Sequence, residues 1–243
     1  MTQILAIDAG TTGVRTLAFD LNGQVTAVAY RPLTQSFPEP GWVEHDGEEI
    51  LRLVLETLTE VAVEVGRQND QVMAIGITNQ RETTIAFDRA TGRSLAPAIV
   101  WQDRRTAARC DALRAVGLEE EVRTTTGLVL DPYFSATKMS WLLEAGVGHR
   151  AKSLALSTID SWILWHLTGG TQGGIFATDP SNASRTMLFD LRTGTWSPAL
   201  TEHFGVPMES LANIRPTSSR FGNVARSSVP ELAGVPISSM IGD

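Results

Sequence analysis

Three apolar or alternating segments cover most of the first 33 residues, and each predicts a β-strand: "ILAIDAG" (4–10), "VRTLAFD" (14–20) and "QVTAVAYRPL" (24–33). The first two are separated by Gly10–Gly13 and the last two by Asn22–Gly23. Asn-Gly is the strongest short signal for a two-residue hairpin turn. We therefore predict that the chain opens with an antiparallel meander.

A helical period follows the meander. Asp46 suits the N-cap, with Glu49 three residues later as in a variant capping box, and Gly66 is expected to close the helix. The apolar positions at helical spacing are Leu51, Val54, Leu55, Leu58, Val61, Ala62 and Val65. The next segment, "VMAIGIT" (72–78), is almost continuously apolar, which predicts a strand covered by helices on both faces.

The rest of the chain alternates short apolar runs with helical segments. We predict strands in "TTIAFDRATG" (83–92) and "PAIVW" (97–101), and a helix in "DRRTAARCDALRAVG" (103–117) that is capped by Asp103 and ended by Gly117. Two more helices are expected around "ATKMSWLLEAG" (136–146) and "STIDSWILWHLTG" (157–169). This order predicts an α/β domain with a mixed β-sheet flanked by helices.

Composition narrows the class of protein. The chain has 243 residues, 42% hydrophobic and 19% charged, with a net charge of −7. This length allows one large domain with a substantial core. A nucleic-acid partner is not expected, because no basic run is present. The single cysteine, Cys110, suits a reducing cytoplasm. No signal peptide or apolar run long enough for a membrane span is seen, so we expect a cytoplasmic protein without a membrane partner.

The turn after the first strand carries groups suited to phosphate. It follows Asp8 and offers two glycines, two adjacent hydroxyls and a nearby cation: Gly10, Gly13, Thr11, Thr12 and Arg15. Backbone N–H groups and hydroxyls bind oxyanions, and an aspartate can hold a hydrated Mg²⁺. The alternative is an ordinary hairpin that uses glycine for its turn and threonine for its strand propensity.

A second candidate is "GITNQRETT" (76–84), where a buried strand ends in polar residues. The carboxyl ends of strands are common ligand sites in α/β sheets. Arg81 as donor and Glu82 as acceptor could together bind neighbouring hydroxyls. Alternatively, the two form a solvated ion pair at a strand end.

Two aromatic residues form the third candidate. Trp101 in "IVWQDRR" and Tyr133 in "DPYFSATK" each combine a flat apolar face with a polar atom, and could enclose a small polyol. Taken singly, each is more often a buried core aromatic.

Taken together and in order, these segments resemble the FGGY family of carbohydrate kinases over residues 3–243, and most closely its glycerol-phosphorylating members. The blocks that carry the resemblance are "DAGTTGVR", "PGWVEHD", "IGITNQRETT", "AIVWQDRR", "TGLVLDPYFSATK", "DSWILWHLTGG", "NASRTMLFD", and "PIS" with the final "GD". The resemblance implies a ribonuclease-H-like fold of the actin/hexokinase/Hsp70-like ATPase superfamily. It also implies ATP-dependent phosphorylation of glycerol to glycerol 3-phosphate.

The resemblance also implies roles for individual residues. Thr11, Thr12, Gly13 and Arg15 correspond to the ATP-phosphate site, and Asp8 to a residue that binds Mg²⁺ through water. Arg81, Glu82 and Tyr133 correspond to ligands of the glycerol hydroxyls, and Trp101 to the wall against its carbon chain. Asp243 corresponds to the catalytic base.

The family pattern also bears on the extent of the chain. Residues 1–243 correspond to an N-terminal domain with the polyol pocket and phosphate turn, whereas ATP is held mostly by a second, C-terminal domain. We therefore expect this chain to be the N-terminal half of a homo-oligomeric enzyme and to be inactive alone.

Two departures from the family pattern stand out. Position 13 is Gly where glycerol-phosphorylating relatives often have Ser. Residues 224–238 lack the basic, glycine-rich loop that binds fructose 1,6-bisphosphate in some bacterial members, so weak or absent inhibition by that effector is expected.

Three other functions remain open at this point. The chain could belong to an FGGY kinase for another polyol or ketose, or it could be a non-catalytic polyol-binding fragment. An actin-like ATPase would share the phosphate turn, but it would not need a polyol pocket.

Overall fold

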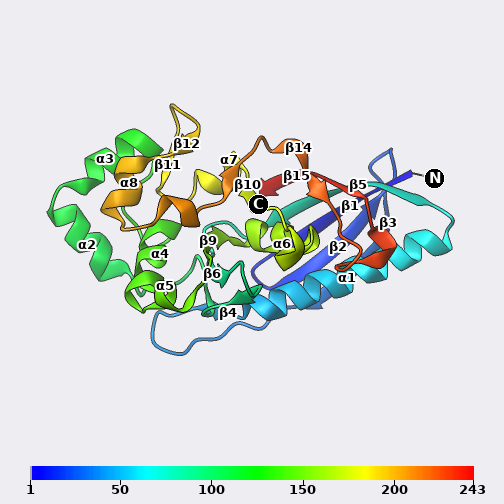
Figure 1. Cartoon of the computed structure of the whole chain (residues 1–243), viewed down its shortest axis with the longest axis horizontal. Coiled ribbons are helices and arrows are strands. Elements are labelled where there is room, and N and C mark those ends of the chain that lie inside the picture. The colour runs from blue at the N-terminus through cyan, green and yellow to red at the C-terminus, as the bar shows by residue number, and fades with distance from the viewer. Residues whose placement is uncertain (1) are drawn as a thin grey trace.

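A computed structural model describes residues 2–243. Within this range, six strands form the main sheet in the order β14-β15-β5-β1-β2-β3 (Figure 1). Their bounds are β1 Thr2–Ala9, β2 Gly13–Phe19, β3 Val25–Pro32, β5 Gln71–Asn79, β14 Ser218–Asn223 and β15 Pro236–Gly242. Strands β5 and β15 run parallel to β1, whereas β2, β3 and β14 are antiparallel to their neighbours. The expected mixed sheet is confirmed.

The opening meander is present, but its second turn differs from the prediction. A two-residue type I′ turn needs a positive φ at both central residues. Gly23 has a φ of 78°, but Asn22 does not have a positive φ. Asp20 N–H donates to the carbonyl of Gln24, so three residues form the loop. The carboxylate of Asp20 accepts from the N–H groups of Asn22 and Gln24, and these bonds stabilise the longer loop.

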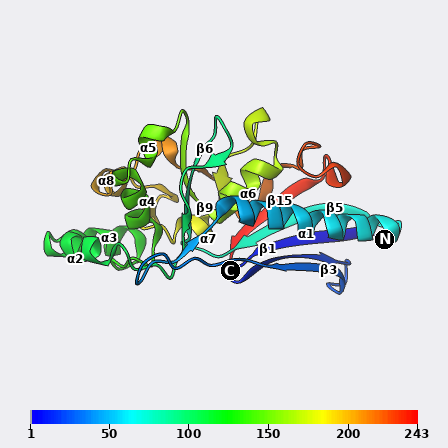
Figure 2. The same cartoon turned by 90° about the horizontal axis from the view of Figure 1, so that it is seen from below.

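Helix α1 (Gly47–Arg67) covers one face of this sheet (Figure 2). Asp46 is its N-cap, as predicted, and accepts from the N–H of Glu48. The predicted end at Gly66 is wrong, because Gly66 lies within the helix and Gln68 is the C-cap. The positive φ that usually falls on a glycine after a helix is found here at Asn69, with φ 57°. An asparagine tolerates this conformation better than most residues.

The opposite face of the main sheet is less covered than expected. Strand β5 was predicted to be buried on both faces, yet only alternate residues such as Ile75 and Ile77 are buried, and Met73 is half exposed. Figure 2 shows no helix against this face in the described range. A parallel strand has two buried faces only where helices cover both sides of the sheet, so the apolar run alone did not determine its burial.

A second sheet lies beside the first and pairs β4, β8, β6 and β7 in that order, with β9 also pairing with β6. Its strands are β4 Glu44–His45, β6 Thr84–Asp88, β7 Arg93–Ser94, β8 Ala98–Ile99 and β9 Leu154–Thr158. Two short pairs complete the strands: β10 Ala177–Thr178 with β13 Asn213–Ile214, and β11 Phe189–Asp190 with β12 Thr195–Trp196. Strand β9 was not predicted from the sequence.

The remaining helices surround the second sheet and its edge. They are α2 Ala107–Ala115, α3 Leu118–Thr126, α4 Ser135–Glu144, α5 Val147–Arg150, α6 Ile159–Leu167, α7 Pro180–Ala183 and α8 Pro198–His203, with 3-10 turns at Gly170–Gln172, Met208–Ser210 and Pro230–Leu232. Helices α4 and α6 confirm two predictions. Asp103 does not cap α2. Its buried carboxylate instead accepts from the N–H of Val43 and binds Arg105.

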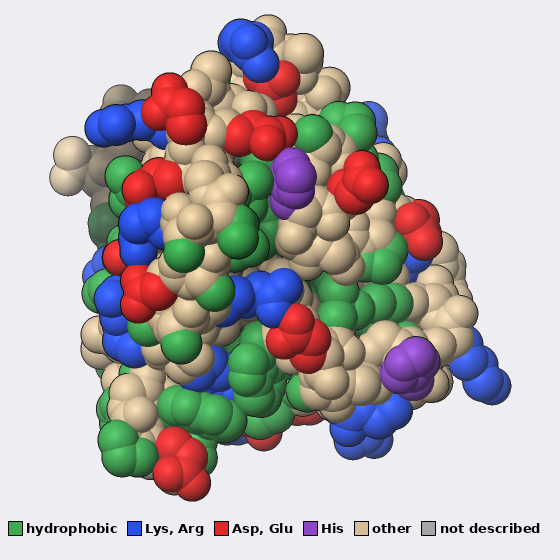
Figure 3. Space-filling view, turned by 90° about the vertical axis from the view of Figure 1, so that its left-hand side faces the viewer, with side chains coloured by type: hydrophobic (Ala, Val, Ile, Leu, Met, Phe, Trp, Pro, Cys, Tyr) green, Lys and Arg blue, Asp and Glu red, His purple; other side chains and the backbone are tan. Residues whose placement is uncertain are grey.

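Two buried clusters form the core. The larger lies between the main sheet, α1 and α6, and includes Trp162, whose indole N–H donates to the carbonyl of Gly47. The smaller is centred on α4 and the second sheet. On the face that α2, α3 and α8 form, acidic and basic side chains are interspersed, as on a solvated surface (Figure 3). Among the described residues, no helix has the length and apolarity needed to span a membrane.

Candidate active site

Three parallel strands end side by side where the two sheets meet. Ala9 of β1 and Gly242 of β15 both pair with Asn79 of β5, so these strands share one carboxyl edge. The N–H of Asp243 donates to the carbonyl of Asn79, and the N–H of Gln80 donates to that of Ala9. The phosphate turn, the polar segment that begins at Asn79, and Asp243 therefore start from the same edge.

The turn after β1 forms the first wall of this region. Gly10 N–H donates to the carbonyl of Gly13 at 3.0 Å, which closes the turn and leaves Thr11 and Thr12 at its tip. Asp8 forms an ion pair with Arg15 on the adjacent strand, in which Oδ2 of Asp8 accepts a 2.6 Å hydrogen bond from Nε of Arg15. Thr11 is partly exposed and Thr12 is exposed in this turn.

Gly13 is explained by its neighbour Tyr30. A Cβ at position 13 would lie 2.5 Å from the Tyr30 ring, and the Tyr30 hydroxyl donates to the carbonyl of Thr12. A residue with a Cβ at position 13 would therefore have to displace the half-exposed Tyr30 ring.

Arg81 and Asp243 lie next to each other at the ends of β5 and β15. Oδ1 of Asp243 is 3.7 Å from Nε of Arg81 and accepts from its backbone N–H at 3.4 Å. A Cβ at Gly242 would overlap the Arg81 side chain, so glycine permits this close approach. Nε of Arg81 is buried without a hydrogen-bond partner among the described residues. The Arg81 side chain as a whole is 32% exposed, so its guanidinium can still reach a ligand at this edge.

Glu82 is not part of a solvated pair with Arg81. Its side chain is 3% exposed, and Oε1 accepts from Nε of Arg185 at 2.6 Å. Glu82 has a φ of 61°, unusual for this residue type, and its carbonyl accepts from the hydroxyls of Thr84 and Ser135. Burial raises the pKa of the Glu82 carboxyl, while Arg185, Arg81 and Lys138 favour its charged form.

The two aromatic candidates lie together, with ring centroids 5.5 Å apart. Both are partly exposed, which is unlike a pair of core aromatics. The indole N–H of Trp101 donates to the hydroxyl of Thr11 at 2.9 Å, so the aromatic wall contacts the phosphate turn directly. The guanidinium of Arg185 lies 5.6 Å from the centroid of the Tyr133 ring. The three candidate segments are therefore connected through contacts.

Sequence reasoning missed two cations that support these residues. Arg185 is 103 residues from Glu82, and no local pattern marks such a partner. Lys138 is fully buried, and its Nζ donates to the carbonyls of Pro132 and Tyr133. Its position within "DPYFSATK" was visible, but its inward direction follows only from the packing of α4.

The residues near the phosphate turn could bind a magnesium ion only together with a nucleotide. Among the described residues, no group of three or more histidine, cysteine or acidic side chains is arranged to hold a metal by itself. Asp8 offers one carboxylate beside the turn. Mg²⁺ commonly takes one or two carboxylates with water and phosphate oxygens, so Asp8 fits an ion that arrives with a nucleotide.

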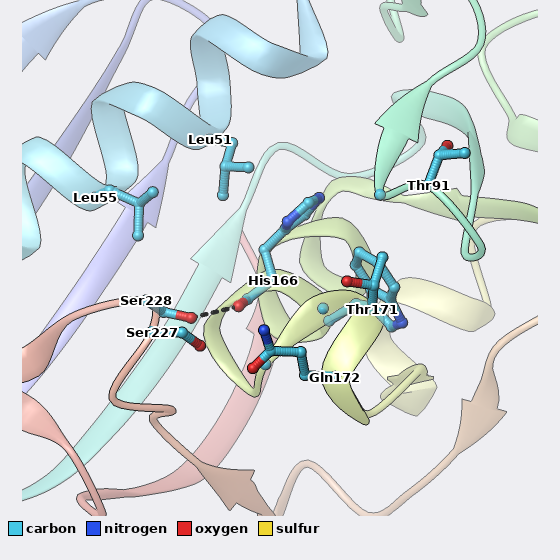
Figure 4. A pocket seen from close by; sticks show the side chains of 12 residues that line it. Leu51, Leu55, Thr91, His166, Thr171, Gln172, Ser227 and Ser228 are labelled. Atoms are coloured by element: carbon cyan, nitrogen blue, oxygen red, sulfur yellow. Dashed lines mark hydrogen bonds between the residues drawn. The ribbon is translucent and has the colours of Figure 1, made fainter.

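A separate hollow of about 310 Å³ lies between α1 and the end of α6 (Figure 4). None of the predicted site residues lines it. His166 contributes to its wall, with its ring edge-on to Trp162 and Trp165. Burial lowers the pKa of His166 to about 4, so the imidazole is neutral near pH 7. The hollow is separate from the candidate active site.

The chain is similar in structure to solved carbohydrate kinases. Glycerol kinase from Plasmodium falciparum, solved with ADP, superposes with a TM-score of 0.93 at 32% identity, and the match covers 100% of this chain and 49% of that one. Xylulose kinase from Rhodospirillum rubrum gives a TM-score of 0.90 at 25% identity, over 99% of this chain and 49% of that one. These matches define an α/β domain of the actin/hexokinase-like ATPase fold, as expected.

The chain belongs to the FGGY family of carbohydrate kinases, because the profile of that family's N-terminal domain matches residues 3–243. Its sequence is 48% identical to glycerol kinase of Thermus brockianus over 249 residues, and 50% identical to that of Gloeobacter violaceus over 244 residues. These matches cover 100% and 99% of this chain but only 49% and 46% of the relatives. The chain thus spans about half the length of the curated relatives it matches.

Proposed function

We propose that this chain forms the polyol-binding and phosphate-binding part of an enzyme that transfers the γ-phosphoryl group of ATP to glycerol, giving glycerol 3-phosphate and ADP. One observation carries the proposal. Arg81 contacts Asp243, Trp101 contacts both Tyr133 and Thr11 of the phosphate turn, and Arg185 lies against Glu82 and Tyr133. The similarity to glycerol kinases over the whole chain supports glycerol as the acceptor.

The side chains proposed to bind the polyol include both donors and acceptors, as a substrate with several hydroxyls requires. A hydroxyl both donates and accepts, so it is best held between a cationic donor and an anionic acceptor. Arg81 supplies the donor through its partly exposed guanidinium group, and Glu82 supplies the acceptor. Tyr133 adds a phenolic hydroxyl, and the ring of Trp101 covers the carbon chain.

Asp243 is the base in this proposal. It accepts the proton of the primary hydroxyl as that oxygen attacks the γ-phosphorus and ADP leaves. Phosphoryl transfer has a loose transition state, so a carboxylate of ordinary basicity is sufficient and positioning provides most of the catalysis. The contact with Arg81 orients the Asp243 carboxylate.

The turn at Thr11–Gly13 binds the ATP phosphates through its hydroxyls and backbone N–H groups, with Arg15 nearby. Asp8 would hold the accompanying Mg²⁺ through water, and the ion would supply positive charge against the phosphates. In the whole enzyme, a second domain would supply the rest of the nucleotide site. We expect that enzyme to be a cytoplasmic homo-oligomer.

The proposal is tested with the complete product of the gene that encodes this chain. ADP formation from ATP is coupled to a spectrophotometric readout with glycerol, xylulose, ribulose and gluconate as acceptors. We expect kcat/KM for glycerol to exceed the others by at least about 100-fold. A preference for a ketose would replace glycerol by that substrate, and no acceptor-dependent ADP formation would overturn the kinase assignment.

A further inference from the structure

Arg185 contacts two of the proposed polyol ligands at once. It follows α7, and its Nε donates to Oε1 of Glu82 at 2.6 Å. Its guanidinium carbon lies 4.8 Å from the centroid of the Phe134 ring and 5.6 Å from that of Tyr133. One side chain therefore borders both the acid and the phenol of the site.

Glu82 depends on such a partner to remain a carboxylate. A buried carboxyl without a cation protonates readily, because its charged form loses solvation. Three cations face Glu82: Arg81 from the same loop, Lys138 from α4, and Arg185. Lys138 donates to two backbone carbonyls, and Arg81 lies against Asp243. Within residues 2–243, Arg185 is the cation in direct contact with Glu82.

The ion pair leaves half of the carboxylate available. Arg185 bonds only to Oε1. Oε2 of Glu82 has no hydrogen-bond partner among the described residues, and it is not fully buried. An ionised Oε2 can accept from a substrate hydroxyl, whereas a neutral carboxyl loses part of this capacity.

We propose that Arg185 is a positioning residue of the polyol site: it keeps Glu82 ionised, directs Oε2 toward the substrate and holds the Tyr133–Phe134 segment. This inference rests on the proposed function of Glu82 and Tyr133. Arg185 acts through these residues and takes no part in the transfer itself.

The test compares Arg185→Met with Arg185→Lys in the complete gene product. Met keeps the apolar contact with Phe134 but removes the charge and the donors. We expect Arg185→Met to raise KM for the polyol by about tenfold or more, with kcat and KM for ATP changed far less. The increase in KM should grow as pH falls, because burial raises the pKa of Glu82 and the cation in direct contact with it is gone. Arg185→Lys, which keeps a charge, should restore part of the affinity.

Arg192→Met is the matched control, because Arg192 is exposed and pairs with Asp190 away from the site. It should leave KM at every pH as in the wild type. A purely structural role would instead lower kcat and affinity equally at all pH values. Such a result, or an unchanged KM in Arg185→Met, would overturn the inference.

A second readout does not need activity. In the 243-residue chain labelled with ¹³C at glutamate carboxyls, the Glu82 signal is assigned with Glu82→Gln and titrated. The pKa of Glu82 should rise in Arg185→Met and stay the same in Arg192→Met. An unchanged pKa in Arg185→Met would refute the role of Arg185 even if the enzyme used another acceptor, so the two proposals can fail separately.

Discussion

The indole Nε1 of Trp101 donates a 2.9 Å hydrogen bond to Oγ1 of Thr11, 90 residues earlier in the chain. Because the indole nitrogen can only donate, the Thr11 hydroxyl must accept this bond. Its own hydrogen is then free to point to another acceptor, such as a phosphate oxygen. This bond links the proposed polyol wall to the proposed phosphate turn.

Trp101→Phe tests this link. The phenyl ring retains an apolar wall but cannot donate, so the Thr11 hydroxyl loses its orientation. We expect kcat to fall by about tenfold, with a smaller change in KM for glycerol. The double variant Trp101→Phe/Thr11→Val should lose less activity than the two single losses combined, because both changes remove this one hydrogen bond.

Trp196→Phe provides the control for that experiment. Its indole N–H donates to the carbonyl of Ala212, outside the candidate site. This variant should leave kcat unchanged. Additive effects of Trp101→Phe and Thr11→Val would show that the hydrogen bond does not couple the two walls.

Asp243→Asn tests the proposed base. Asparagine has nearly the same shape but cannot accept the substrate proton, so kcat should fall by roughly 100-fold to 10,000-fold with KM for glycerol largely kept. Arg81→Met should do the reverse and chiefly raise KM, because it removes a substrate donor. Steady-state kinetics of the complete gene product separates the two. Retention of more than about a tenth of kcat in Asp243→Asn would exclude Asp243 as the base.

Gly13→Ser tests the steric relation with Tyr30. The new Cβ would displace the half-exposed Tyr30 ring and weaken its bond to Thr12, so we expect the free energy of unfolding to fall by at most about 1 kcal/mol in urea titrations. In a Tyr30→Ala background the same substitution should cost almost nothing. Gly66→Ser is a useful comparison, since a Cβ at Gly66 would meet no atom within 4 Å apart from the backbone of its own helix. Equal costs with and without Tyr30 would contradict this explanation.

The buried Lys138 should make stability depend on pH. Burial lowers its pKa from 10.5 to about 7 in the folded protein. Between these values the unfolded chain binds more protons than the folded one, so this group's contribution to stability rises as pH increases from about 7 to 10.5. The stability difference between wild type and Lys138→Met should therefore change across that window, in favour of the wild type as pH rises, by at most about 1.4 kcal/mol per pH unit.

Thermal and urea unfolding of both proteins from about pH 7 to 10 measures this difference. Lys152→Met, at an exposed position, should change stability little at any pH in the series. A constant difference between wild type and Lys138→Met would show that Lys138 keeps its proton in the folded protein. The two carbonyl bonds of Lys138 would then belong to the ammonium form.

Local patterns were sufficient for much of the fold. The strands of the opening meander, β5, and helices α1, α4 and α6 were all predicted, because each has a clear apolar period over its own length. The same reasoning assigned the wrong cap to α2 and the wrong turn to Asn22–Gly23. In both places an aspartate could bond to several nearby N–H groups, and the surrounding structure decided which.

By itself, the sequence determined the family, the order of the main elements and the residue types that could bind a polyol and phosphate. These properties are carried by contiguous segments, and short-range spacing is preserved in any fold of the chain. Only the tertiary structure decided that Glu82 is buried, that Arg185 is its partner and that Trp101 bonds to Thr11. Those contacts join residues 90 or more positions apart. Their formation depends on three strand ends meeting at one edge, which no single segment encodes.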